Sequence, residues 1–291
     1  MPSASQWFQA ARPHTWANAF APVIAGSGAA AFQGGFSWWR ALLAAGVSWA
    51  LIIGVNYAND YSDGIKGTDE DRTGPLRLTG SGIAAPASVK RAAFIAFGVA
   101  GVLGIALSLA SAWWLIVVGL VCILAAWFYT GGSNPYGYRG LGEVAVFTFF
   151  GLVAVCGTEF TQAGRISLAG LTTAIAVGSI SAAVNLANNL RDIPTDTEAG
   201  KITLAVRLGD AGTRRLWLIL AAMPLVASLL LSALCTPWAL VGLASAVLLV
   251  PASRPIRSGA LGPALIPVLG LTGRAMLAWS VITAVALAFG G

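Results

Sequence analysis

The sequence carries little charge for its length. Only 10% of its 291 residues are Asp, Glu, Lys or Arg, and 57% are hydrophobic. Soluble domains carry roughly 25% charged residues, so this composition excludes an ordinary soluble domain and indicates an integral membrane protein. A net charge of +6 would suggest a nucleic-acid partner in a soluble protein. In a membrane protein the surplus Lys and Arg mark cytoplasmic loops instead, and we expect no nucleic-acid partner.

Cysteine and histidine are also scarce, with three Cys and one His in the chain. Cys122, Cys156 and Cys235 lie in apolar runs and lack the spacing of a metal site or a disulfide framework. No basic region precedes the first apolar stretch, so we expect no cleaved signal peptide.

Long apolar segments are abundant. About 20 apolar residues cross a bilayer, and nine segments qualify, at roughly 14–33, 38–58, 91–110, 112–130, 142–161, 168–190, 214–234, 237–252 and 272–290. We therefore expect an all-α integral membrane protein of nine transmembrane helices, forming a single domain over residues 1–291.

The start of the last span has two interpretations. A start near Leu261 would place Arg274 in the middle of the bilayer, which is costly. Pro263 and Pro267 fit a broken segment better than a helix interior. We favour a span that begins at Thr272, after a short interfacial or re-entrant segment.

Positive charge predicts the orientation. With the N-terminus inside, 14 Lys and Arg residues fall in inner loops, and only Arg40 and Arg165 fall in outer loops. We expect a multi-pass protein of the cell membrane, with its C-terminus outside. Eight of the chain's 11 acidic residues lie in two inner, cytoplasmic loops.

These two loops begin with related motifs, "NYANDYSDG" at 56–64 and "NLANNLRDI" at 185–193. At an offset of 129 residues, the following pairs are identical: Asn56 and Asn185, Ala58 and Ala187, Asn59 and Asn188, Asp63 and Asp192. The match predicts two pseudo-repeated halves, roughly 1–135 and 136–291, whose loops face each other across a pseudo-symmetry axis.

The spacing within each motif places polar side chains on one face of a helix end. Asn59 and Asp63 are four residues apart, and Asn188, Asp192 and Asp196 continue the same pattern. Carboxylate and amide oxygens are ligands that Mg²⁺ prefers, with substrate phosphates completing its shell. We predict a metal-bridged diphosphate between the two stripes, with Asp60 or Asp69 completing the first. Solvated loop charge is the simpler alternative.

Basic residues follow each stripe, and a bound diphosphate requires such neutralisation. The candidates are Lys66, Arg72, Arg77 and Lys201. Each could equally be a topology anchor. The Gly- and Pro-containing segment "GPLRLTGSG" favours Arg77, because it suggests a structured loop.

The paired motifs resemble those of the UbiA-type intramembrane prenyltransferases. The family pattern N-x-x-x-D-x-x-x-D matches both loops, except that Gly67 stands where the third acid of the first stripe would be. "GIKGTD", "GPLR" and "YTGG" are similar to segments of the bacterial 1,4-dihydroxy-2-naphthoate polyprenyltransferases of menaquinone synthesis.

The resemblance implies helices around a central cavity and Mg²⁺-dependent transfer of a polyprenyl chain from its diphosphate to 1,4-dihydroxy-2-naphthoate. Decarboxylation would give demethylmenaquinone. Asp63 and Asp192 would act in catalysis, and Tyr129 could stabilise the allylic cation or orient the acceptor, unless it is an interfacial tyrosine. Arg12 and Arg139 are candidates for binding the aromatic acid.

Two alternatives remain. A prenyltransferase could use another acceptor, such as 4-hydroxybenzoate or homogentisate. A cation-coupled transporter would also contain repeats and acidic pairs, but its ionisable groups lie near the bilayer midplane. Glu159 belongs to neither motif, and we expect Glu159→Gln to be nearly silent.

The predicted orientation can be tested by labelling. A cysteine introduced near Gly291 should react with an impermeant thiol reagent in intact cells, because nine crossings place it outside. Protection there, together with labelling of a cysteine placed in the 66–75 loop, would show the reverse orientation.

Overall fold

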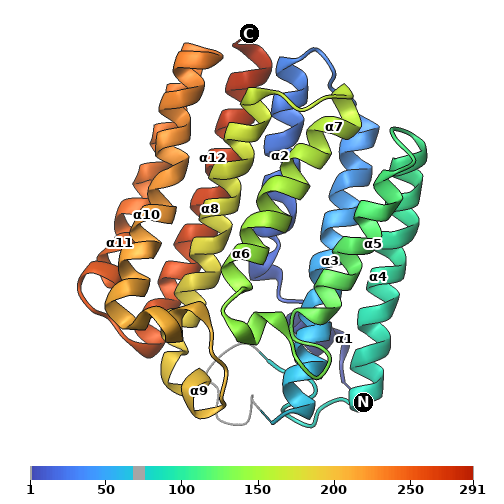
Figure 1. Ribbon diagram of the computed structural model, residues 1–291, viewed down its shortest axis with the longest axis vertical. Helices are drawn as coiled ribbons and strands as arrows, with labels where there is room; N and C mark the ends of the chain where they lie inside the picture. Colours follow the sequence, from blue (N-terminus) through green and yellow to red (C-terminus); the bar gives the residue numbers. More distant parts are fainter. Residues whose placement is uncertain (1, 68–75, 291) are drawn as a thin grey trace.

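The computed structural model describes residues 2–67 and 76–290 as a bundle of helices, with no β-strand in those ranges (Figure 1). The α-helices are α1 (Ala4–Ala10), α2 (Ala17–Phe32), α3 (Trp38–Ile65), α4 (Pro86–Leu109), α5 (Leu115–Phe128), α6 (Gly142–Val146), α7 (Gly157–Ala163), α8 (Leu168–Arg191), α9 (Ile193–Glu198), α10 (Leu204–Leu234), α11 (Ala246–Arg257) and α12 (Ile266–Phe289). Short 3₁₀ turns and one π-helix connect them: η1 (Pro13–Thr15), η2 (Tyr136–Arg139), η3 (Phe147–Cys156, the π-helix), η4 (Pro237–Ser245) and η5 (Gly262–Leu265).

Seven helical runs of the described chain are long and apolar enough to cross a membrane. They are Trp38–Ile65, Pro86–Leu109, Gly142–Ala163, Leu168–Arg191, Leu204–Leu234, Pro237–Arg257 and Gly262–Phe289. The predicted segments 14–33 and 112–130 correspond to the shorter apolar helices α2 and α5. The prediction of an all-helical membrane protein is therefore confirmed.

The prediction that the last span begins at Thr272 is wrong. The helix α12 begins at Ile266 and follows directly on η5. Pro267 lies in the first turn, where its missing N–H would have no intrahelical partner, so it starts the helix rather than breaking it. Arg274 is exposed on α12, and its Nε donates to the Gly270 carbonyl oxygen at 3.2 Å.

The helix α8 forms the centre of the bundle. It packs against α10, α12 and η3. In its most apolar stretch 67% of the residues are buried inside the protein, compared with 28–39% in the other candidate spans. Small residues permit the closest approach, since a Cβ on Gly151 of η3 would lie 2.5 Å from the Gly178 Cα of α8. This contact fixes η3 against the helix that carries the second acidic stripe.

Both stripe-bearing helices end on the same side of the molecule. In Figure 1 the lower ends of α3 and α8 lie beside α1 and α9, and the C-terminus lies at the opposite end of the bundle. The polar residues of the two motifs are therefore gathered at one end, although 129 residues separate them in the sequence.

Glu159 has a structural role that the sequence did not indicate. Its side chain is fully buried, and its Oε1 accepts hydrogen bonds from Gln33 Nε2 at 2.6 Å and from Ser167 N at 3.1 Å and Oγ at 2.5 Å. It thus ties α7 to the end of α2 and to the start of α8, so its substitution should affect stability.

We accordingly expect Glu159→Ala to destabilise the protein by about 1–3 kcal/mol, because it leaves partly buried donors of Gln33 and Ser167 without an acceptor. Thermal unfolding in detergent would measure the loss. Glu198→Gln is the matched control, since Glu198 is exposed at the end of α9. Equal stability of the two variants would contradict the assigned role.

Candidate active site

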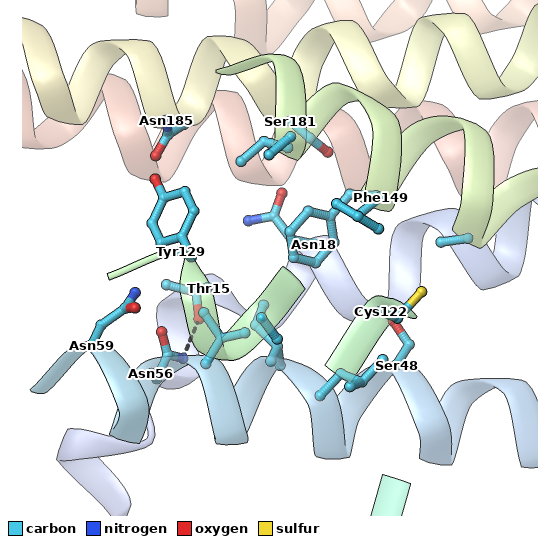
Figure 2. Close-up of a pocket in the computed structure, with 18 of the residues that line it drawn as sticks. Thr15, Asn18, Ser48, Asn56, Asn59, Cys122, Tyr129, Phe149, Ser181 and Asn185 are labelled. Carbon is cyan, nitrogen blue, oxygen red and sulfur yellow. Dashed lines mark hydrogen bonds between the residues drawn. The ribbon is translucent and has the colours of Figure 1, made fainter. Parts of the chain in front are cut away.

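A cavity of about 1030 Å³ lies among α2, α3, α4, α5, η3 and α8. Its apolar part is lined by residues such as Leu51, Ile105, Ile116, Phe149 and Val153. In Figure 2, Asn56, Asn59, Tyr129 and Asn185 gather toward one end of the view, and Ser48 and Cys122 lie toward the other. A polar end joined to a long apolar space suits a substrate with a charged head and a hydrocarbon tail.

The carboxylate of Asp63 is the meeting point of three chain segments. The Tyr138 hydroxyl donates to its Oδ1, Lys201 Nζ lies 3.6 Å from the same oxygen, and an Arg77 guanidinium nitrogen lies 3.9 Å from Oδ2. Asp63 is only 4% exposed. The first stripe, the loop after α5 and the loop after the second stripe are therefore joined at one buried charge.

The second stripe is organised by Arg191. This guanidinium donates to both Asp192 oxygens, at 2.6 and 2.8 Å, and to Asn188 Oδ1 at 2.9 Å. Asn188, Arg191 and Asp196 line the cavity, whereas Asp192 is not among the lining residues and reaches the site through its contacts with Arg191. Asp192 caps the end of α8 and the start of α9, and the backbone N–H of Asp196 in α9 donates to the Asp192 carbonyl oxygen at 2.8 Å.

Oxygen atoms of both stripes could hold a hard metal ion. Asn59 and Asp63 line the cavity with Asn188 and Asp196, and the Thr130 hydroxyl donates to Asn59 Oδ1 at 2.8 Å. Within residues 2–67 and 76–290, no three His, Cys, Asp or Glu side chains form a metal-binding group. A metal held there would take amide and substrate oxygens besides the carboxylates, as Mg²⁺ commonly does. Asp69 and Arg72 lie outside the described residues.

Two lysines flank the ring of Tyr138. Lys66 Nζ lies 4.9 Å and Lys201 Nζ lies 4.7 Å from the ring centroid. Lys66 Nζ also donates to the Thr130 carbonyl oxygen at 2.8 Å. Burial lowers the pKa of Lys66, Asp63 opposes that shift, and the neighbouring Lys201 adds to it. Lys201 lines the polar end of the cavity, and Lys66 lies beside the Tyr138 ring, outside the lining and exposed.

The N-terminal segment contributes a second cation, Arg12, to the cavity. Arg12 lines the cavity and is the only non-glycine residue of the described chain with a positive φ, at 53°. Asn56 fixes this turn, since its Nδ2 donates to the Ala11 carbonyl oxygen and to Thr15 Oγ1, both at 3.0 Å (Figure 2). Burial, with the charges of Arg12 and Arg191, lowers the pKa of His14.

Two predicted site residues lie elsewhere. Asp60 is outside the cavity lining, and its carboxylate accepts from the backbone N–H groups of Leu78 and Thr79 at 2.7 and 2.9 Å. It therefore anchors the segment that carries Arg77 and does not line the cavity. Arg139 is exposed on η2, away from the lining, so the structure does not support it as an acceptor ligand.

Tyr129 lies in the cavity wall, at the end of α5. Its hydroxyl points at the Asn185 side chain (Figure 2). A Cβ on Gly142 would lie 3.1 Å from the Tyr129 Oη and 3.3 Å from the Asn185 Nδ2, so a larger residue there would crowd both side chains. The phenol ring therefore faces the space between the two stripes.

The sequence patterns missed Tyr138, Thr130 and Arg191. Tyr138 lies within the "YTGGSNPYGYRG" segment and Arg191 within the second motif, so both could have been suspected from their neighbours. Nothing in the spacing predicts that Tyr138 reaches Asp63, because the contact spans 75 residues.

The chain matches the model of the UbiA prenyltransferase family over residues 19–263. The chain belongs to this family. Over 290 residues it is 58% identical to a 1,4-dihydroxy-2-naphthoate octaprenyltransferase of Mycobacterium tuberculosis, an alignment that covers 100% of this chain and 99% of that protein. The prediction of a UbiA-type prenyltransferase is therefore confirmed, and the protein is an enzyme.

Solved structures share the UbiA fold at low sequence identity. The apo structure of a UbiA homolog from Aeropyrum pernix K1 matches with a TM-score of 0.70 and 17% identity, covering 90% of this chain and 96% of that one. A UbiA homolog from Archaeoglobus fulgidus bound to DMAPP and Mg²⁺ matches with a TM-score of 0.66 and 13% identity, covering 96% and 99%.

The convergence on Asp63 predicts the effect of single changes. Asp63→Asn and Asp192→Asn should each reduce prenyl transfer by about 10²–10³-fold, because each would remove negative charge from the predicted metal and diphosphate site. The double variant should lose much less than the product of the two factors, because the residues act as a unit.

Turnover of purified protein, with thermal unfolding as the test of folding, measures both effects. Glu198→Gln is the control, since it is an exposed acid near the second stripe. Near-normal turnover of both Asp variants would show that the stripes are not the diphosphate site.

Proposed function

We propose that the enzyme transfers a polyprenyl chain from its diphosphate to 1,4-dihydroxy-2-naphthoate, with loss of CO₂, to give the hydroquinone form of demethylmenaquinone. The observation that carries this proposal is the ring of basic and phenolic groups around Asp63, at the polar end of a cavity of about 1030 Å³. The 58% identity to a naphthoate octaprenyltransferase supports this acceptor.

The diphosphate would bind at the Asp63 group. Lys201 and Arg77 lie within 3.6 and 3.9 Å of its carboxylate and would neutralise charge on the leaving group as the allylic C–O bond breaks. Mg²⁺ held by oxygens of Asn59, Asp63, Asn188, Asp192 and Asp196 would supply further charge neutralisation, in keeping with the relative bound to DMAPP and Mg²⁺. Lys66 lies beside this group. We propose Asp69 and Arg72 as further ligands on sequence grounds alone.

The cavity would keep water from the allylic cation. The apolar wall excludes competing hydrolysis, and the Tyr129 ring presents a π-face that favours positive charge. The ring carbon that bears the carboxylate would then form the new C–C bond with the allylic cation. The C–COO⁻ bond breaks and CO₂ leaves, and the bond's electron pair returns to the ring, which leaves the neutral prenylated hydroquinone with both hydroxyl protons in place.

The carboxylate of the acceptor would face the Arg12 guanidinium. Arg12 lines the cavity beside Asn56, and a guanidinium binds a carboxylate with two parallel hydrogen bonds. The strained backbone of Arg12 is consistent with a functional role, since such strain persists where the surroundings enforce it.

We also propose that α2 and α5 cross the bilayer with the seven longer runs, which gives nine spans in one domain over residues 1–291. The positive charges support a cytoplasmic active site in the cell membrane, with the C-terminus outside. The motif identity at an offset of 129 residues supports two repeated halves, roughly 1–135 and 136–291.

The acceptor assignment can be tested with purified protein, a polyprenyl diphosphate and Mg²⁺. With 1,4-dihydroxy-2-naphthoate, mass analysis should show a product that has gained the prenyl group and lost CO₂. A product that retains the carboxylate, or turnover with 4-hydroxybenzoate or homogentisate alone, would overturn the assignment.

A further inference from the structure

Glu143 is a buried acid next to the cavity that the proposed chemistry does not use. It lies in the first turn of α6 and is only 4% exposed. Its Oε1 accepts from Asn189 Nδ2 at 2.7 Å and from Asn185 Nδ2 at 3.2 Å, and its Oε2 is buried without a hydrogen-bond partner among residues 2–67 and 76–290. An ionisable side chain placed in a bundle interior is costly, so a function for it should be sought.

The two asparagines occupy successive turns of α8, and both line the cavity. An ionised carboxylate only accepts hydrogen bonds, so Glu143 fixes which end of each amide faces it. With both NH₂ groups turned to Glu143, the amide oxygens remain for the cavity. Figure 2 shows the Asn185 oxygen directed at the Tyr129 hydroxyl.

We propose that Glu143 is a positioning residue that fixes the Asn185 and Asn189 amides as hydrogen-bond acceptors for the hydroxyl groups of the aromatic substrate. This inference rests on the proposed function and deepens it. A site that turns amide oxygens toward the ring favours a hydroxylated aromatic acid. The Asn189 oxygen would lose its substrate partner when a ligand lacks a hydroxyl, whereas the Asn185 oxygen also faces the Tyr129 hydroxyl.

The alternative is that Glu143 only holds α6 against α8. The two roles differ in what Glu143→Ala changes. Loss of a packing contact lowers stability and affects both substrates alike. Loss of amide orientation changes the acceptor alone, since Lys201 and Arg77 contact Asp63 and not Glu143.

The experiment measures KM for both substrates with Glu143→Ala, Glu143→Gln and Asn189→Leu. It also measures the inhibition constant of 1-hydroxy-2-naphthoate, which lacks one hydroxyl. Glu143→Ala should raise the KM for 1,4-dihydroxy-2-naphthoate about tenfold and change that for the prenyl diphosphate less than twofold. It should weaken 1-hydroxy-2-naphthoate much less, so the preference for two hydroxyls falls.

Glu143→Gln should restore most of the acceptor affinity, because its side-chain oxygen still accepts from the amides. Asn189→Leu should reproduce the acceptor-specific loss, and Glu143→Ala should add little to it, because the two residues act through one contact. Equal changes in both KM values, or an unchanged hydroxyl preference in folded Glu143→Ala and Asn189→Leu, would overturn the proposal. Failure of the unaltered enzyme to use 1,4-dihydroxy-2-naphthoate would instead refute the proposed function.

Discussion

A buried carboxylate must be paired, and the polar end of this protein is arranged around one such group. The Asp63 carboxylate accepts a hydrogen bond from Tyr138 and forms ion pairs with Lys201 and Arg77, and these three residues lie in different parts of the chain. An unpaired negative charge in this position would cost several kcal/mol of desolvation, by the general rule for buried ions. The same requirement that stabilises the fold thus gathers cations where a diphosphate would need them.

The supporting contacts explain why the group is held firmly. Asp60 anchors the segment of Arg77 through two backbone N–H groups, and Arg191 holds Asp192 and Asn188 together. Neither Asp60 nor Arg191 needs to touch a substrate to matter. Residues that hold the charged side chains of a site in position are as necessary to its function as the ligands themselves.

The bundle supplies the apolar half of the site. The π-helix η3 brings Phe149 and Val153 to the cavity, and its close contact with α8 leaves no room for a side chain at Gly151. π-Helical turns are frequent at functional sites, because the extra residue per turn redirects side chains. The long apolar space and the charged end are therefore built by the same helices.

The sequence by itself determined the membrane class, the helical segments and the two acidic stripes, because composition, segment length and i,i+4 spacing are local properties. It also indicated the prenyltransferase family. Only the tertiary structure decided that Asp60 anchors a loop, that Arg139 lies outside the cavity, that Glu159 is buried and that α12 begins at Ile266. Those outcomes depend on contacts between distant segments, such as the hydrogen bond between Asp63 and Tyr138, which are 75 residues apart. Local spacing cannot predict such contacts.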